Sequence, residues 1–249
     1  MNTAFLRWVE LDRSGLPAQP EYPFDLPVLH QLERLAFHPK VTYLIGENGI
    51  GKSTLMEALA VACGFNPEGG GRNLQFATRA THSELHAHLR LARGVRTPRD
   101  GYFFRAESYY NVATRIDELD AEPSFGAPIR NAYGGRSLHE MSHGESFFAT
   151  FMHRFGGRGL YLLDEPEAAL SPLRQMAMLS QVHELVRRHS QFVIATHSPI
   201  LMAYPDAAIY TLSPEGIVQT PWEETEHYVI TKQFLNHTDR MLGELLQDE

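Results

Sequence analysis

The chain has 249 residues, a formal net charge of −8, a hydrophobic share of 43% and one cysteine. That length suits one large α/β domain with a substantial core, and the apolar share is ordinary for a globular protein. No run approaches the ~18–20 apolar residues of a membrane helix, and the negative charge argues against a nonspecific coat on nucleic acid. The N-terminus has no basic region followed by an apolar one, and Cys63 cannot pair within the chain, so we expect a cytoplasmic protein without membrane insertion.

The chain begins with a proline-rich segment and then turns apolar. Residues 1–40 contain five prolines, which predicts short strands and extended segments rather than helices. Residues 41–45 (Val-Thr-Tyr-Leu-Ile) are apolar and β-branched and are followed by glycine, so they are expected to form a buried strand.

Residues 46–54 read Gly-Glu-Asn-Gly-Ile-Gly-Lys-Ser-Thr and match the pattern Gly-x-x-x-x-Gly-Lys-[Ser/Thr]. The glycines let backbone N–H groups point at phosphate oxygens, the lysine reaches the β- and γ-phosphates, and the serine hydroxyl ligates Mg²⁺. Lys52 to Cys63 is expected to be a helix, whose N-terminal dipole favours the anion. The sequence therefore predicts a Mg-ATP site formed by Gly46, Glu47, Asn48, Gly49, Ile50, Gly51, Lys52, Ser53 and Thr54.

Residues 72–105 are rich in arginine and end in the strand-like run Tyr102-Phe-Phe-Arg105. Seven arginines (72, 79, 90, 93, 96, 99 and 105) stand against Glu84 and Asp100, a local charge of +5. One interpretation is a phosphate-facing patch near the ATP site that binds nucleic acid or a partner protein. The alternatives are a solvated face, or ion pairs with the acidic residues of segment 214–249.

Residues 138–146 read Leu-His-Glu-Met-Ser-His-Gly-Glu-Ser and precede an apolar helical stretch. A Ser-x-Gly turn that opens a helix presents a hydroxyl and free N–H groups, which suit a γ-phosphate. Taken alone, Ser142 is better explained as a simple N-cap.

The run Gly159-Leu-Tyr-Leu-Leu163 predicts a short buried strand that ends in Asp164 and Glu165. In the Walker B pattern the first carboxylate holds the Mg²⁺ shell and the second polarises the attacking water, although an acidic turn is a common strand end. Ser171-Pro172 then opens a helix. Its expected buried stripe is Leu173, Met176, Leu179, Val182 and Val186.

A second buried strand is expected at residues 191–196, and His197 follows it directly. A histidine at a strand end beside a phosphate site can hydrogen-bond the γ-phosphate or the attacking water, although an isolated histidine is usually a surface or core residue. Residues 207–212 and 216–219 are expected to be strands, and a last helix is expected at about residues 229–246.

These four motifs in this order resemble the ATP-binding-cassette (ABC) ATPase superfamily, over roughly residues 36–213. The chain looks most like small stand-alone ATPases related to the heads of structural-maintenance-of-chromosomes proteins. The resemblance implies an α/β P-loop NTPase fold: a mostly parallel sheet flanked by helices, an antiparallel β subdomain and a small helical signature subdomain. It also implies catalytic roles for Lys52, Glu165 and the switch histidine His197, and magnesium ligation by Ser53 and Asp164.

By the same resemblance, the signature residues Ser142, Gly144 and Glu145 contact ATP held by a second subunit, so a homodimer is expected on ATP binding. Residues 169–171 correspond to the D-loop. Tyr22 or Phe24 is a candidate for stacking on adenine, with a core or interface role as the commoner alternative.

The sequence departs from the transporter members of the superfamily at several positions. His143 and Glu145 replace a glycine and the glutamine of the signature, and Ile50 occupies a P-loop position that is usually small and polar. The Q-loop glutamine has no clean match: Gln75 lies early, and Glu107 is the preferred occupant.

We therefore expect a single ATPase domain over residues 1–249. Its parts are an N-terminal β segment (1–40), a P-loop core with the arginine-rich insertion (41–135), the signature, Walker B and switch region (136–213) and an acidic tail (214–249). The leading functional prediction is a soluble ATP hydrolase that acts with nucleic acid or a partner protein. The alternatives are a nucleotide-binding subunit of an ABC transporter and a nucleotide sensor with negligible turnover.

Overall fold

A seven-stranded sheet forms the centre of the computed structural model, which describes residues 4–16, 21–74, 83–123 and 126–246. The strand order is β10-β9-β3-β8-β7-β6-β4, in which β9, β3, β8, β7 and β6 run parallel and the two outer strands pair antiparallel. The strands are β3 (Val41–Ile45), β4 (Gly70–Gly71), β6 (Asp100–Arg105), β7 (Gly159–Asp164), β8 (Gln191–Ala195), β9 (Ala208–Ser213) and β10 (Gly216–Gln219). Every residue of β3, β7 and β8 is buried, as expected for parallel strands covered on both faces.

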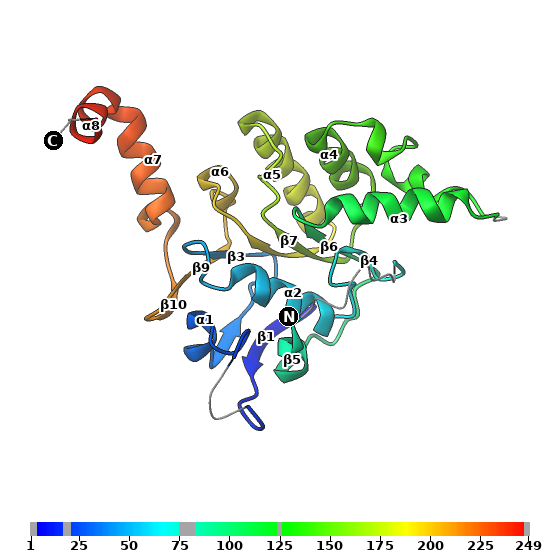
Figure 1. Cartoon of the computed structure of the whole chain (residues 1–249), viewed down its shortest axis with the longest axis horizontal. Coiled ribbons are helices and arrows are strands. Elements are labelled where there is room, and N and C mark those ends of the chain that lie inside the picture. The colour runs from blue at the N-terminus through cyan, green and yellow to red at the C-terminus, as the bar shows by residue number, and fades with distance from the viewer. Residues whose placement is uncertain (1–3, 17–20, 75–82, 124–125, 247–249) are drawn as a thin grey trace.

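A separate antiparallel sheet, in the order β2-β1-β5, lies beneath the central sheet (Figure 1). It consists of β1 (Leu6–Leu11), β2 (Arg34–Ala36) and β5 (Leu89–Arg93). The predicted fold class, a mostly parallel α/β sheet with an antiparallel β subdomain, is confirmed.

Helices cover both faces of the central sheet. In Figure 1, α3 (Tyr109–Ala121), α4 (His143–His153), α5 (Pro172–Arg187) and α6 (Pro199–Met202) lie above it, and α2 (Lys52–Ala62) lies below it with α1 (Pro27–His30). Side chains of β3 alternate between the two resulting cores: Tyr43 and Ile45 pack with the upper helices, and Leu44 packs with α2 and the small sheet. The 3₁₀ segments are Glu84–His88, Ile129–Tyr133, Leu138–Glu140 and Trp222–Glu224.

The C-terminal region differs from the single helix expected. It forms two helices, α7 (Glu226–Asn236) and α8 (Thr238–Leu245), which project from the body of the protein (Figure 1). At His237 the backbone leaves the helical region, with φ −136° and ψ 38°. Thr238 Oγ1 donates to the carbonyl of Phe234, a local bond of the kind that competes with helix geometry.

The buried face of α5 also differs from the predicted stripe. Met178, Val182 and Leu185 are buried, whereas the side chains of Leu173 and Met176 are exposed (72% and 50%). Both exposed residues lie in the first turns of α5, so the helix packs into the core only from Met178 onward. In the described part of the chain, no helix combines the length and apolarity needed to cross a membrane.

Candidate ATP site

The P-loop lies where the sequence places it, between the end of β3 and the start of α2. Two of its glycines are required by space. A Cβ on Gly46 would collide with the carbonyl oxygen of Leu212, and a Cβ on Gly51 would lie 2.9 Å from Cγ1 of Val28. Gly46, Gly49 and Gly51 all have positive φ, which glycine adopts at little cost. Glycine thus lets the loop pack closely against the backbone of Leu212 and the side chain of Val28.

The P-loop has an exposed part and a buried part. Glu47, Asn48 and Gly49 are exposed, while Ile50 is 6% exposed and packs into the lower core. This contact explains why an apolar residue replaces the usual small polar one. Residues 47–49 therefore remain accessible to a ligand, while the buried side chain of Ile50 anchors the loop to the core.

The side chain of Lys52 binds to the backbone of the P-loop. Its Nζ donates to the carbonyl oxygens of Gly46 (2.7 Å) and Glu47 (2.9 Å). Burial lowers the pKa of this ammonium, while the carboxylates of Glu165 and Asp164 oppose the shift. The lysine is thus held inside the loop that is predicted to cradle the phosphates.

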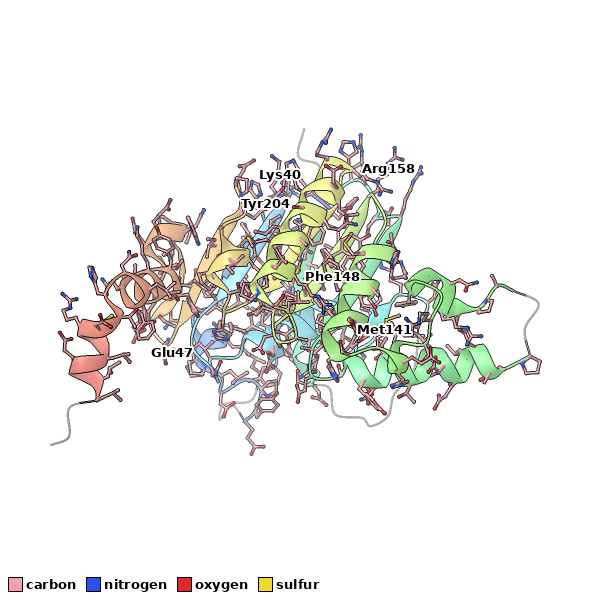
Figure 2. All side chains as sticks on the ribbon, turned by 90° about the horizontal axis from the view of Figure 1, so that it is seen from above. Lys40, Glu47, Met141, Phe148, Arg158 and Tyr204 are labelled. Carbon is pink, nitrogen blue, oxygen red and sulfur yellow. The ribbon has the colours of Figure 1, made fainter. Side chains whose placement is uncertain are left out.

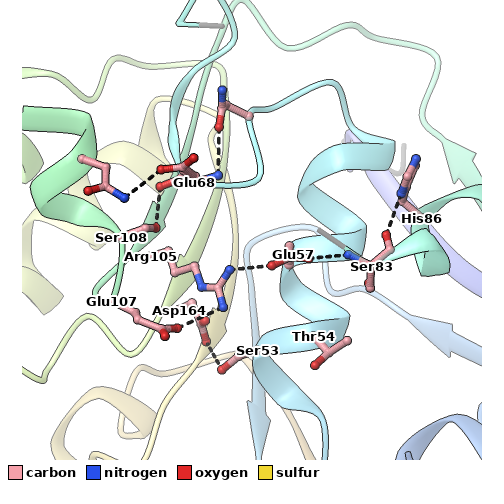
Figure 3. Close-up of polar contacts among 12 residues, drawn as sticks. Ser53, Thr54, Glu57, Glu68, Ser83, His86, Arg105, Glu107, Ser108 and Asp164 are labelled. Atoms are coloured by element: carbon pink, nitrogen blue, oxygen red, sulfur yellow. Dashed lines mark hydrogen bonds and ion pairs between the residues drawn. The ribbon is translucent and has the colours of Figure 1, made fainter. Parts of the chain in front are cut away.

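Ser53 and Asp164 meet across the site. Ser53 Oγ donates to Oδ1 of Asp164 at 3.2 Å (Figure 3), and burial raises the pKa of Asp164 to about 7. A hydroxyl and one carboxylate suit Mg²⁺, which takes oxygen ligands and normally keeps waters and substrate phosphates as the rest of its shell. Among the described residues, no cluster of three or more His, Cys, Asp or Glu side chains forms a metal site.

Glu165 has an unusual backbone conformation at the end of β7. Its φ is +51°, in the left-handed region that a non-glycine residue rarely occupies, and its N–H donates to the carbonyl of Ala195 in β8 (2.9 Å). Its Oε1 lies 3.9 Å from Nε2 of His197. The backbone turn thus directs the two predicted catalytic side chains toward each other.

His197 is held by two residues that sequence reasoning missed. Its backbone N–H donates to Oε1 of Glu167 (2.6 Å), and its Nδ1 lies 3.0 Å from Nε2 of His227 on α7. Glu167 follows the Asp-Glu-Pro motif by one residue, which is a local signal. His227 lies 30 residues from His197 and only the fold brings it close, so no sequence pattern marked it.

The signature residues lie at the start of α4. Ser142 and Glu145 form a capping box: the backbone N–H and Oγ of Ser142 both donate to Oε2 of Glu145 (3.1 and 2.7 Å). This replacement of the signature glutamine therefore has a local structural function. A Cβ on Gly144 would collide with the carbonyl oxygen of Ala169, so the predicted D-loop packs directly on the signature turn.

Glu107 lies immediately beyond β6, next to the Walker B end of the sheet (Figure 3). Its side chain is 80% exposed and accepts from Nη2 of Arg105 (3.0 Å), and Arg105 also pairs with Glu57. Arg105 is opposite Asp164 in the β6–β7 register, and its charge opposes the rise of the Asp164 pKa. The Q-loop role of Glu107 stays a prediction, and Gln75 lies outside the described residues.

The two aromatic candidates for adenine stacking have different surroundings. Tyr22 is 65% exposed, and its hydroxyl lies 3.3 Å from Oγ1 of Thr54 in the P-loop helix. Phe24 packs edge-on against His88 with ring centroids 5.1 Å apart. Tyr22 is therefore the one available to a nucleotide at the P-loop.

The arginine-rich segment does not form one patch at the ATP site. Arg105 lies there, but Arg90 pairs with Asp12 and Arg93 donates to the carbonyl of Ala62. Arg96 and Arg99 precede β6 and so lie at the opposite edge of the sheet, so the interpretation as a patch near the ATP site does not hold for these two residues. Arg79 lies outside the described residues.

Comparisons with known proteins agree with this geometry. A family model described as "AAA domain" matches residues 27–110, and one described as "AAA domain, putative AbiEii toxin, Type IV TA system" matches residues 105–203. The cobalt import ATP-binding protein CbiO of Salmonella paratyphi A is 26% identical over 250 residues, covering 88% of this chain and 87% of CbiO. The hemin import ATP-binding protein HmuV of Nocardia farcinica is 29% identical over 191 residues, covering 72% of this chain and 65% of HmuV.

A solved structure of MJ1267, an ATP-binding cassette of an ABC transporter, superimposes with a TM-score of 0.53. The alignment covers 95% of this chain and 97% of MJ1267 at 16% identity, so it shows a shared fold. The fold, the P-loop and the matched family models lead to the same conclusion. The chain is a P-loop ATP hydrolase with the fold of the ABC-type ATPases.

Proposed function

We propose that this ATPase hydrolyses Mg-ATP at two sites shared across a head-to-tail dimer. One chain has one P-loop and one signature turn. Figure 2 shows Glu47 of the P-loop and Met141, next to Ser142, apart from each other on the edge opposite Lys40 and Arg158. This separation is the observation that carries the proposal, because a signature turn remote from its own P-loop can complete only a partner's site. Two-fold packing of identical chains then gives two complete sites.

The residues of one chain divide the chemistry among them. Lys52 would exchange the carbonyls of Gly46 and Glu47 for phosphate oxygens. Ser53 and Asp164 would hold Mg²⁺, which neutralises charge on the phosphates when bound. Glu165 would orient the attacking water and accept its proton, and Ser142 would contact the γ-phosphate on the partner's P-loop.

Sedimentation of the Glu165→Gln variant tests the shared site. ATP would form part of the interface through its γ-phosphate, so dimers should form with Mg-ATP and dissociate with ADP. Adding Ser142→Arg should prevent the dimer without stopping nucleotide binding. A Glu165→Gln protein that stays monomeric at saturating Mg-ATP would exclude the shared-site mechanism.

For the biological output, the comparisons support the transporter alternative better than the leading prediction from sequence. CbiO and HmuV are both import ATP-binding proteins, and the match to CbiO spans most of both chains. We therefore propose that the chain serves as the ATP-binding subunit of an ABC transporter. A pull-down with ATP-trapped Glu165→Gln protein should then recover a membrane protein with several membrane-spanning helices.

A second candidate is a soluble ATPase, related to chromosome-maintenance heads, that acts on nucleic acid or a partner protein. It is favoured by the altered signature, with His143 and the Glu145 capping box, and by Glu107 in place of a Q-loop glutamine. The family model named for the AbiEii toxin, which spans the signature and Walker B, also favours it. The same pull-down would then recover nucleic acid or a soluble protein. A nucleotide sensor would instead bind ATP with negligible turnover, which an ATPase assay detects.

A further inference from the structure

A cationic hollow lies at the edge of the central sheet opposite the ATP site. The adjacent parallel strands β6, β7 and β8 all begin at this edge, so the turns before them meet there. Figure 2 shows Arg158, which precedes β7, on the side of the molecule away from Glu47. The hollow has a volume of about 450 Å³ and is lined by Phe5, Arg96, Thr97, Arg99, Arg158 and His189.

The charge of this hollow is unbalanced. Its lining contains three arginines and a histidine but no carboxylate, although the whole chain has a net charge of −8. Among the described residues, no acidic side chain forms an ion pair with Arg96, Arg99 or Arg158. Asp100, next in sequence to Arg99, is already engaged by Arg154, by the Tyr161 hydroxyl and by the N–H of Gly156. Within the described part of the chain, these three guanidinium groups therefore have no acidic partner.

The hollow is also held in place by backbone contacts between its turns. The N–H of Arg99 donates to the carbonyl of Arg158 (2.9 Å), and the N–H of Arg158 donates to the carbonyl of Arg188 (2.8 Å). Arg158 and His189 have φ values of 59° and 64°, in the left-handed region where glycine or asparagine is usual. The left-handed conformation of His189 closes the end of helix α5, where the N–H of Ser190 donates to the carbonyl of Leu185 (2.9 Å). The cationic groups are thus presented on a fixed frame.

The cationic lining extends into an adjoining hollow of about 180 Å³. The two hollows share Phe5, Arg96 and Thr97, and the smaller one adds Arg72 and Arg93. All the permanent charges in both hollows are guanidinium groups, whose planar forks match phosphate oxygens in pairs. A series of such forks suits a ligand with more than one phosphate group.

We propose that this hollow binds the phosphate groups of an anionic ligand, at a site separate from the ATP site. The shared chemistry is a chain of phosphate groups, supplied either by a free polyphosphate or by the backbone of a single nucleic-acid strand. Arg99 and Arg158, from neighbouring turns joined by a hydrogen bond, form the centre of the site.

Two probes, tripolyphosphate and a labelled oligo(dT) strand, test the site in full-length Lys52→Ala protein, in which the P-loop no longer competes. Each probe is titrated into two proteins. One is the Lys52→Ala protein, and the other is the same protein that also carries the substitutions Arg99→Gln and Arg158→Gln. The matched control is Arg187→Gln/Arg240→Gln, which removes two equally exposed arginines (68% each) elsewhere. Thermal melting confirms that each variant is folded.

We expect the Arg99/Arg158 pair of changes to weaken binding by about tenfold or more, and the control to retain it. If the oligo(dT) strand binds more tightly than tripolyphosphate, nucleic acid is identified as the source of the phosphates. In that case the slope of log K against log salt concentration should be smaller by roughly 1.4 in the Arg99/Arg158 variant, because two phosphate contacts are lost. Binding of tripolyphosphate alone identifies a free polyphosphate. If neither probe binds, or if binding survives loss of both arginines, the proposal is overturned. With Lys52 intact, the same changes should leave ATP turnover unaltered, so this result is independent of the proposed function.

Discussion

Nδ1 of His197 lies 3.0 Å from Nε2 of His227, so the C-terminal helix α7 reaches the switch histidine directly. Trp222 secures this contact, because its indole N–H donates to the carbonyl of Pro199, two residues beyond His197 (3.0 Å). Burial lowers the pKa of both histidines, and the charge of Lys52 lowers that of His197 further. Both rings are therefore neutral near pH 7, and one must donate to the other.

The His227→Ala variant should lower kcat by roughly tenfold and change KM little. With His227 as donor, Nδ1 of His197 accepts and its Nε2 carries the proton. That Nε2, 3.9 Å from Glu165 and without a hydrogen-bond partner among the described residues, can then donate to the γ-phosphate. Without His227 the tautomer and ring orientation are no longer fixed. Steady-state ATPase kinetics measure the effect.

A His227→Gln variant is the control, because its side-chain amide can still donate to Nδ1 of His197. It should recover most of the lost kcat, whereas His197→Ala should not respond to either change at position 227. If ATP turnover is unchanged in the His227→Ala variant, His227 contributes only to packing and does not orient His197.

Substitutions at Lys52 and Glu165 should separate nucleotide binding from hydrolysis. Lys52→Ala should abolish binding, since the charge that faces the β- and γ-phosphates is lost. Glu165→Gln should bind normally and hydrolyse at least about 10²-fold more slowly, as general-base removal does. Nucleotide titration and phosphate release on the same preparations provide both readouts. Wild-type turnover in Glu165→Gln would mean that another group accepts the proton.

Gly144→Ala should disturb the signature turn without touching the P-loop. The added methyl would collide with the carbonyl of Ala169, so we expect a loss of about 1–3 kcal/mol in unfolding free energy from overpacking. ATP turnover should fall while nucleotide binding persists, because only the signature is displaced. Denaturant unfolding and ATPase assays test both effects.

Gly243→Ala in helix α8 is the matched control, since nothing lies within 4 Å of the new methyl group. It should be neutral or stabilise by up to about 1 kcal/mol, the difference in helix propensity. Equal effects of the two substitutions would contradict the steric argument at Gly144.

Asp100→Asn should destabilise the edge of the sheet opposite the ATP site. Asp100 accepts from the Tyr161 hydroxyl (2.7 Å), Arg154 (2.9 Å) and the N–H of Gly156 (2.8 Å), so losing its charge should cost about 2–3 kcal/mol of unfolding free energy. Burial alone would raise the pKa of Asp100, but these hydrogen bonds lower it below 3.8.

The sign of the pH dependence follows from that lowered pKa. A carboxylate with a depressed folded-state pKa stabilises fully above its unfolded pKa and loses this contribution as pH falls through the folded value. The difference between wild type and Asp100→Asn should therefore be constant near neutral pH and shrink below about pH 4. Denaturant melts across this range test it, and a difference that persists at the acid end would contradict the assignment.

Local patterns predicted the strands around the candidate ATP site well. The strands before Gly46, Asp164 and His197 were expected from continuous apolar runs, and the structure has them as β3, β7 and β8. The C-terminal ends of neighbouring parallel strands share one edge, so their terminal residues had to meet. The start of the helix at Ser171-Pro172 could also be predicted, because an N-cap depends only on residues next to one another in the sequence.

The errors arose where packing rather than local pattern decides. Leu173 and Met176 continue an apolar helical stripe in the sequence, but α5 packs into the core only from Met178 onward, which the sequence does not encode locally. The arginines of residues 72–105 are close in sequence, yet the strand β6 carries Arg99 and Arg105 to opposite edges of the sheet.

The sequence by itself thus determined the main strands, the P-loop and the other motifs, because each is a local pattern within about ten positions, and their order along the chain indicated the fold class. The tertiary structure alone decided that His227 contacts His197 and that Gly144 packs on Ala169. It also decided that Arg96, Arg99, Arg158 and His189 share one hollow. These relationships join segments separated by 25 to 93 positions, and chain topology rather than local propensity sets such distances.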